Sequence, residues 1–501
     1  MRDKHQIDWV AFGSSIAVIL LVCIPLAMFP DSGGKVLLDI YQWIAGELGY
    51  LYLAFGVFVL IFLLWLAGSR YGRVRLGRAD DEQEFSTPSW AAMLFCAGVG
   101  AGLLAWAPIE WGYYLDAPPF GAEPRSTEAM EWASTYGIFH WGFTAWAFYC
   151  LPTLAIAYPY YVKRTRSLRF SHSCHYLLGG REDTRAGRLL DLLFMIGLLG
   201  GAGSSLGFST PLIAGLFGRL TGLKADFGME FAIILLSVVL FATSVWLGLR
   251  RGIKRLSELN MLLALLVLAY VLIIGPTGFL LDTSVNSVGL MMQNFLRMNS
   301  WTGAFSDASF VQDWTIFYWA WWIAYGPFVG LFVTRISRGR SIREVVFGML
   351  GYGSLGCALF YMIIGNYGLH LELAGAAPVA ATLSQQGAPA ATSMILSELP
   401  LGVLVIAAYA VVALVFSVTT YDSASYILAS SATRLLPIGQ NPVRWHRVFW
   451  AFMLAVLPLT LLFIGGLKVV QTATLVVSLP LLGVGALMAW SLLAQLRADH
   501  P

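Results

Sequence analysis

Residues 314–328 read Trp-Thr-Ile-Phe-Tyr-Trp-Ala-Trp-Trp-Ile-Ala-Tyr-Gly-Pro-Phe, an apolar run that ends in a Gly-Pro pair. The run contains four tryptophans, two tyrosines and two phenylalanines. A helix needs far fewer large rings to cross lipid, because leucine serves that purpose better. Electron-rich ring faces in a dry site attract a cation that offers no hydrogen-bond donor, such as a quaternary ammonium. This stretch therefore predicts a membrane helix that carries an aromatic site for a quaternary ammonium compound.

The whole chain has the composition of an integral membrane protein. Of its 501 residues, 58% are hydrophobic and only 12% are charged, whereas soluble proteins average about 25% charged residues. Apolar runs near or above roughly 18 residues recur along the chain, and in lipid such runs form helices. We expect an all-α membrane protein in which residues 1–501 form a single transmembrane domain.

The apolar runs predict twelve spans. Their expected positions are 9–29, 48–68, 90–114, 132–162, 188–217, 228–249, 258–280, 314–334, 344–366, 400–432, 444–465 and 469–494. With the N-terminus inside, 25 of the 31 lysines and arginines fall on the cytoplasmic side, as the positive-inside rule requires. Both termini are therefore predicted to be cytoplasmic. Residues 284–300 are weakly amphipathic, which is compatible with a surface helix or with a plain loop.

Two of the predicted spans contain residues that weaken a helix. Residues 96–102 read Cys-Ala-Gly-Val-Gly-Ala-Gly, and Gly326-Pro327 ends the aromatic run. Close helix packing is one explanation of such glycines. Interruptions at corresponding positions of two halves are instead typical of inverted-repeat transporters and mark a binding site near the midplane. This second interpretation predicts a first repeat at 90–280 and a second at 314–495, with peripheral helices in 1–89.

Several motifs together resemble one transporter family. They are Gly98-Val99-Gly100-Ala101-Gly102, Ile109-Glu110-Trp111, Phe139-His140-Trp141, the run 314–328, and the loop Arg335-Ile336-Ser337-Arg338-Gly339-Arg340. From about residue 9 to 495 the chain resembles the betaine/choline/carnitine transporters, and near residues 109–121 it is most similar to their carnitine/γ-butyrobetaine branch. The resemblance implies a LeuT-like core of two inverted five-helix repeats with two extra N-terminal helices. It also implies alternating access, a homotrimer and the inner (plasma) membrane of a bacterium.

The resemblance also implies which rings bind the substrate. By position they are Tyr113 in span three, Trp141, Trp146 and Tyr149 in span four, and Phe317, Trp321, Trp322 and Tyr325 in span eight, with Trp314 as an outer entry site. The spacing itself supports part of this set, because Phe317, Trp321 and Tyr325 are four residues apart and share one helical face. Any single ring could equally be a packing residue or belong to an interfacial belt.

The coupling ion is expected to be sodium. In the sodium-coupled relatives one site matches the hydroxyls of Thr419 and Thr420 and the backbone carbonyls of Phe416, Cys96 and Val99. The alternative is that these hydroxyls bond to carbonyls of their own helix. Sodium-independent exchangers of the family place an arginine where this chain has Asn260, and a neutral amide cannot replace a cation. Sodium symport is therefore expected, with exchange as the alternative.

The sequence also bears on the coupling ion, the substrate and the class of function. A proton could be the coupling ion, with Glu110 or Asp422 as its acceptor. Choline-type members of the family tend to carry an aspartate where this chain has Gly102, which favours a zwitterion. The expected order is carnitine or γ-butyrobetaine first, then glycine betaine or a sulfonium analogue, then choline. No nucleophile–base pair, metal cluster or phosphate loop is recognisable, so we expect neither an enzyme nor an organic cofactor, and no nucleic-acid partner. A ligand sensor would need a signalling domain, for which the sequence gives no indication.

Overall fold

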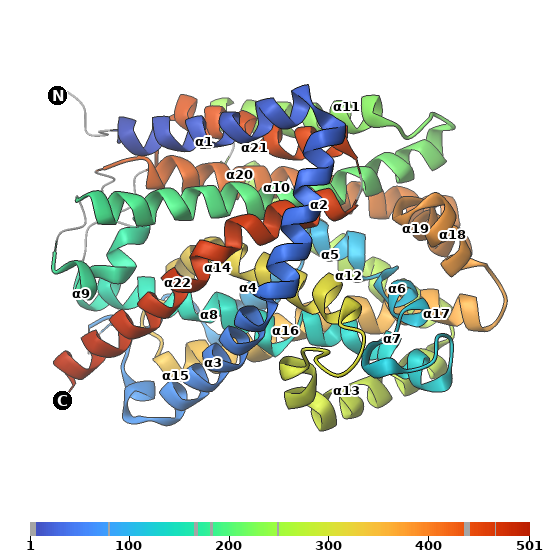
Figure 1. Ribbon diagram of the computed structural model, residues 1–501, viewed down its shortest axis with the longest axis horizontal. Helices are drawn as coiled ribbons and strands as arrows, with labels where there is room; N and C mark the ends of the chain where they lie inside the picture. The colour runs from blue at the N-terminus through green and yellow to red at the C-terminus, as the bar shows by residue number, and fades with distance from the viewer. Residues whose placement is uncertain are drawn as a thin grey trace.

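The computed structural model describes residues 7–78, 81–164, 169–180, 184–247, 250–434, 441–465 and 467–500. Within these residues the chain is a helical bundle with no β-strand (Figure 1). Ten helical stretches of this part are long and apolar enough to cross a membrane. They are α1 (Trp9–Met28), α3 (Gly49–Gly68), α10 (Arg185–Thr221), α11 (Phe227–Leu247), α12 (Arg250–Ile274), α14 (Ile316–Ile336), α20 (Gly402–Ser431), α21 (Arg444–Ile464), α22 (Leu467–Asp499), and a stretch built from α15 (Ile342–Gly348), α16 (Ser354–Phe360) and α17 (Asn366–Leu373), which are joined by π-helical turns.

The two remaining predicted spans, 90–114 and 132–162, are not single helices. The first consists of α4 (Thr87–Gly98), α5 (Ala101–Trp106) and α6 (Glu110–Asp116), and the second of α7 (Thr127–His140), α8 (Phe143–Ala157) and a π-helical turn (Tyr158–Val162). Between α4 and α5 the backbone is extended at Val99 and Gly100, because glycines on both sides make a helix costly there. The predicted break in span three is confirmed, but a count of twelve continuous spans is not.

The predicted break at Gly326-Pro327 is wrong. Helix α14 continues through this pair from Ile316 to Ile336. Both Gly326 and Gly330 lie against α8: a Cβ on Gly326 would stand 2.8 Å from the carbonyl oxygen of Phe148, and one on Gly330 would stand 2.9 Å from the amide nitrogen of Thr153. The glycines serve close helix packing, and a packed neighbouring helix lets a membrane helix tolerate proline. The matching interruptions expected of two repeats are therefore absent, and the division into repeats at 90–280 and 314–495 stays a prediction.

Several helices of the described residues lie largely outside the predicted spans. Among them are α2 (Pro30–Glu47), α9 (His175–Leu178), α13 (Thr277–Ser300), α18 (Val379–Gln386) and α19 (Ala388–Ser397). Helix α13 includes residues 284–300, so the amphipathic stretch is a helix and not a loop. Helix α2 runs across the long axis of the bundle (Figure 1).

Helices α10 and α14 form the centre of the bundle. The apolar window of the span that contains α14 is 83% buried, whereas that of α1 is 22% buried, so α1 belongs to the rim. Glycines let α10 approach its neighbours closely: a Cβ on Gly200 would meet Val477 of α22, and one on Gly201 would meet Tyr325 of α14. Small residues at helix interfaces of this kind allow tight packing in lipid.

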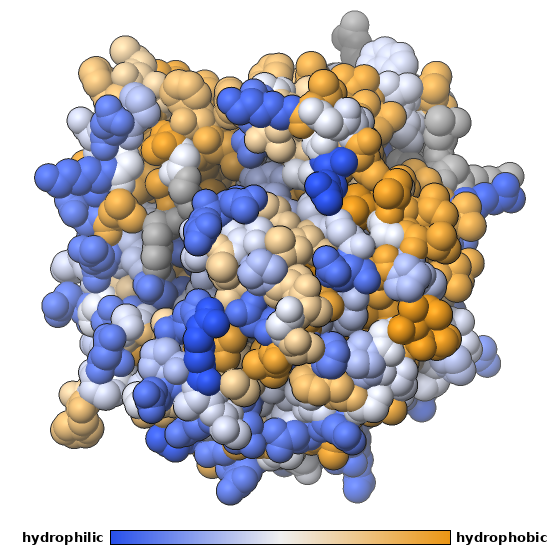
Figure 2. All heavy atoms as spheres, turned by 90° about the vertical axis from the view of Figure 1, so that its right-hand side faces the viewer, coloured by the Kyte–Doolittle hydropathy of each residue, from blue (hydrophilic) through white to orange (hydrophobic). Residues whose placement is uncertain are grey.

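Both described termini lie at one end of the bundle (Figure 1). The amide of Asp8 donates to the carbonyl of Ala432 at 2.8 Å, and Lys163 forms an ion pair with Asp499 at 2.5 Å. We call this the terminal end. Figure 2 shows the opposite end, where hydrophilic side chains spread over the middle and lower part of the face and apolar ones gather at its upper left and right flanks. Which end faces the cytoplasm stays a prediction.

Candidate functional site

A cavity of about 1,580 Å³ penetrates the bundle between α4, α5, α8, α10, α12, α14 and α20. Its inner wall carries six of the predicted rings: Trp141, Trp146, Tyr149, Trp321, Trp322 and Tyr325. We call these six residues the aromatic cage. The outer part of the wall includes Arg335, Asn441 and Arg444, and the adjacent Arg434 pairs with Asp8 at 3.4 Å. The cavity therefore opens toward the terminal end.

Trp322 is the hub of the aromatic cage. Its ring stacks on Trp321 at a centroid distance of 5.0 Å and an interplanar angle of 12°. Trp141 meets it edge to face at 4.6 Å, and Tyr149 does so at 5.9 Å. Trp146 in turn contacts Tyr149 at 5.4 Å. Rings that meet at right angles present faces in several directions, as a compact spherical cation requires.

Backbone carbonyls orient the two central indoles. The Nε1–H group of Trp322 donates to the carbonyl oxygen of His140 at 2.9 Å, and that of Trp321 donates to Gly201 at 3.2 Å. Trp141 sits at the break between α7 and α8, just before Gly142, where a Cβ would lie 2.5 Å from the carbonyl oxygen of Ile138. The kink therefore requires glycine at position 142, and it places the indole of Trp141 at the end of α7 against Trp322 of α14.

Three predicted substrate residues do not line the cavity. These residues are Tyr113, Trp314 and Phe317. They pack on the inner side of the cavity against two rings that were not predicted as site residues, Trp106 and Phe208. Trp106 meets Trp314 at 5.7 Å and Phe208 at 5.3 Å, Tyr113 meets Trp314 at 5.1 Å, and Phe208 meets Phe317 at 5.8 Å. These five residues form an aromatic plug next to the cage, because Phe208 also contacts Trp321 at 5.0 Å.

The position of Trp106 could have been read from the sequence. It follows Gly102 by four residues, which places both on one face of α5. No comparable signal marks Phe208, because it lies in a long helix of uniformly apolar and small residues.

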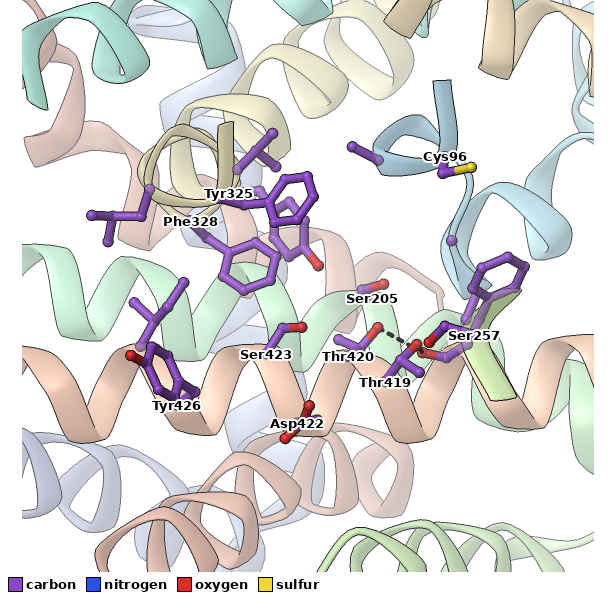
Figure 3. Close-up of a pocket in the computed structure, with 18 of the residues that line it drawn as sticks. Cys96, Ser205, Ser257, Tyr325, Phe328, Thr419, Thr420, Asp422, Ser423 and Tyr426 are labelled. Carbon is purple, nitrogen blue, oxygen red and sulfur yellow. Dashed lines mark hydrogen bonds between the residues drawn. The ribbon is translucent and has the colours of Figure 1, made fainter. Parts of the chain in front are cut away.

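All five predicted sodium ligands line the same cavity: Cys96, Val99, Phe416, Thr419 and Thr420. The end of α4 with Cys96 faces the side of α20 with the two threonines (Figure 3). Both threonine hydroxyls donate to the carbonyl oxygen of Phe416 at 2.9 Å, so in this structure they bond to their own helix. Their oxygens retain lone pairs, while the Phe416 carbonyl already accepts two hydroxyl hydrogen bonds.

The predicted coupling position lies behind the cavity wall. Asn260 of α12 is 4% exposed, and its Nδ2 donates to the carbonyl oxygen of Val412 in α20 at 3.2 Å. Its Oδ1 is buried without a hydrogen-bond partner. Asp422 also lines the cavity, but it lies apart from Tyr325 and Phe328 on α20 (Figure 3) and accepts a hydrogen bond from Arg447 at 2.6 Å. Asp422 thus forms an ion pair outside the cage.

Comparison with known proteins identifies the class to which this architecture belongs. Residues 10–501 match the family described as BCCT, the betaine/carnitine/choline family of transporters. The chain belongs to this family. As a BCCT protein it is a multi-pass membrane transporter and not an enzyme.

Two curated BCCT relatives cover most of the chain. A protein of Escherichia coli strain K12 called "Uncharacterized transporter YeaV" is 38% identical over 445 residues, which cover 88% of this chain and 92% of the relative. A protein of Acinetobacter baumannii called "Carnitine transporter" is 34% identical over 488 residues, which cover 97% of this chain and 88% of the relative. The similarity therefore extends over the aromatic cage, the plug and α20 alike.

Proposed function

We propose that the chain transports a trimethylammonium zwitterion, with carnitine or γ-butyrobetaine as the first candidates and glycine betaine next. The observation that carries this proposal is the aromatic cage at the inner end of a cavity that opens at one end of the bundle. Each ring that faces a desolvated ammonium contributes roughly 0.5–2 kcal/mol. Three or four such rings give affinities on the order of micromolar to millimolar, which suits a carrier that must also release its substrate.

The surroundings of Gly102 favour a zwitterion over a simple cation. A Cβ at this position would stand 3.0 Å from Cη2 of Trp321 and 3.3 Å from the hydroxyl of Ser205. Glycine thus leaves the wall beside the cage uncharged where choline-type relatives carry an aspartate. A substrate that brings its own carboxylate needs no such neighbour. The relative named as a carnitine transporter supports the same choice.

We further propose that transport is coupled to sodium. The hydroxyl oxygens of Thr419 and Thr420 and the carbonyls at the end of α4 supply oxygen ligands on facing walls of one cavity. Asn260 brings no positive charge that could replace the ion. Sodium-independent exchange is the second candidate, and the observation in its favour is that both hydroxyls donate to the Phe416 carbonyl, one of the expected ligands.

Alternating access then requires the aromatic plug to open. Because the cavity opens toward the terminal end, substrate could reach the opposite end if Trp106, Trp314 and Phe317 separate. In that outward-open state Trp314 would line the entry route that the resemblance assigns to it, and Tyr113 would face the substrate beside it. A homotrimer and cytoplasmic termini complete the proposal, on the strength of the family resemblance and the distribution of basic loops.

Uptake of radiolabelled carnitine into proteoliposomes tests the proposal. The lumen is kept free of substrate, and the inward sodium gradient is present or replaced by potassium. Accumulation that requires sodium supports symport. Uptake that ignores sodium and appears only after the vesicles are preloaded with a betaine establishes exchange and removes the role proposed for Thr419 and Thr420. Absence of uptake under both conditions contradicts the proposed substrate class.

A further inference from the structure

A carboxylate is buried beside the aromatic cage. Glu110, the first residue of α6, is 0% exposed. Its Oε1 accepts a hydrogen bond from the hydroxyl of Tyr114 at 2.5 Å, and its Oε2 accepts from Tyr318 at 2.5 Å and from Tyr361. The three phenols come from α6, α14 and the π-helical turn Tyr361–Gly365. One carboxylate thus ties three separate segments together.

The phenol donors around Glu110 also set the hydrogen-bond roles of the neighbouring His140. The hydroxyl of Tyr114 donates its only hydrogen to Glu110. The Nδ1 of His140 lies 3.0 Å from the Tyr114 oxygen, so Nδ1–H must be the donor in that contact. The Nε2 of His140, 3.0 Å from the hydroxyl of Thr315, is then the acceptor. The hydrogen bonds that link Glu110, Tyr114, His140 and Thr315 are therefore all satisfied when the imidazole carries a single N–H proton.

Among the described residues, no lysine or arginine forms an ion pair with Glu110. The imidazole of His140, with Nδ1 3.6 Å from Oε1, is the one basic group that the structure pairs with it among the described residues. The other groups that face it are phenols, which stabilise a carboxylate by hydrogen bonds but leave its charge in place. In surroundings of low polarity that charge acts over a longer range than it would in water.

The residues that contact Glu110 also pack against the rings of the aromatic cage. The ring of Tyr318 stacks on Trp322 at 5.6 Å and 21°, and on Trp321 at 6.2 Å and 20°. The ring of Tyr361 lies 6.1 Å from that of Trp141. The carbonyl oxygen of His140 accepts the indole N–H of Trp322. A single layer of side chains therefore separates the carboxylate from the cage.

We infer that Glu110 is a positioning residue whose negative charge also strengthens the cage for the quaternary nitrogen of the substrate. It fixes Tyr318 and Tyr361 behind the indoles, and it supplies a constant attraction for a cation on their far side. At a separation on the order of 10 Å and an effective dielectric constant near 20, two unit charges attract strongly enough for roughly a tenfold change in binding. This inference rests on the proposed function of the cage.

Two ligands of the same shape distinguish the effect of the Glu110 charge from its role in positioning the rings. One is carnitine, and the other is 3-hydroxy-5,5-dimethylhexanoate, in which carbon replaces the quaternary nitrogen. Their dissociation constants are measured by calorimetry on the purified full-length protein and on Glu110→Gln. We expect the dissociation constant for carnitine to rise about tenfold, and that for the carbon analogue to change less than about twofold, because only carnitine carries the charge that Glu110 attracts.

Two control variants keep the inference falsifiable. Glu110→Asp retains the charge and should restore most of the preference for carnitine over the carbon analogue. Tyr361→Phe removes one donor and keeps the charge, so it should preserve that preference even where Glu110→Gln fails to fold. Equal weakening of both ligands in Glu110→Gln, or loss of the preference in Tyr361→Phe, would overturn the inference. Failure of the unmodified protein to bind carnitine would instead contradict the proposed function.

Discussion

The indole N–H of Trp322 donates to the backbone carbonyl of His140 at 2.9 Å, which fixes the hub of the aromatic cage to the last residue of α7. The side chain of the same histidine contacts Tyr114 and Thr315. His140 therefore holds the cage through its backbone and the Glu110 cluster through its ring. A cage that is fixed before the ligand arrives loses less entropy on binding.

Gly330 tests the packing of α14 on α8. In Gly330→Ala the new Cβ would meet the backbone nitrogen of Thr153 at 2.9 Å, and backbone cannot move aside as a flexible side chain would. We expect a loss of about 1–3 kcal/mol of stability, seen as a lower melting temperature in detergent. Gly289→Ala is the control, because a Cβ there meets nothing within 4 Å. Equal melting temperatures for the two variants would show that the approach of the helices is not tight at Gly330.

Gly102 tests the preference for zwitterions. In Gly102→Asp a carboxylate beside Trp321 would attract choline and repel the carboxylate of carnitine. We expect the ratio of choline to carnitine uptake to rise about tenfold, a change of about 1.4 kcal/mol. Gly102→Asn adds nearly the same bulk without the charge and should lower uptake of both substrates without changing that ratio. The same ratio in both variants would mean that steric contact, and not charge, acts at this position.

The threonine hydroxyls test the sodium site. Thr419→Val and Thr420→Val keep the side-chain shape and remove an oxygen that would bind the ion. We expect the sodium concentration for half-maximal carnitine uptake to rise about tenfold in each variant, as the loss of about 1.4 kcal/mol of binding requires. Ser430→Ala serves as the control, because this hydroxyl bonds to Tyr426 further along the same helix. An unchanged sodium dependence in both valine variants would exclude these hydroxyls as ligands.

Much of the architecture follows from local sequence patterns. Ten of the predicted spans correspond to single helical stretches, since runs of apolar residues must form helices in lipid. The glycines of residues 96–102 correctly predicted a break, which the structure places at Val99 and Gly100. The four-residue spacing of Phe317, Trp321 and Tyr325 correctly predicted a shared helical face. Of these rings, Phe317 belongs to the aromatic plug, whereas Trp321 and Tyr325 line the cavity.

Other features depend on packing that no single segment contains. Gly326-Pro327 has the local signature of a helix break, yet close contact with α8 keeps α14 continuous. The break after Trp141 depends on one glycine in an otherwise helical sequence. The Glu110 cluster brings together Tyr114, Tyr318 and Tyr361, whose separation in sequence gives no hint of their contact. Such relationships arise from the arrangement of α6, α7, α14 and the π-helical turn Tyr361–Gly365 in space.

Carnitine uptake by two matched tryptophan variants tests the central claim most directly. Trp322 lines the cavity, whereas Trp319, three residues earlier on α14, is fully buried against Phe139 and Phe148 and does not line it. Both tryptophans are replaced by leucine, and the melting temperature of each variant is recorded. We predict that Trp322→Leu raises the carnitine concentration for half-maximal uptake about tenfold or more, because a ring that binds the cation is lost. We predict that Trp319→Leu lowers the melting temperature. It should leave the concentration for half-maximal uptake within about twofold of that of the unmodified protein. An unchanged concentration in folded Trp322→Leu would contradict recognition of the substrate by the aromatic cage.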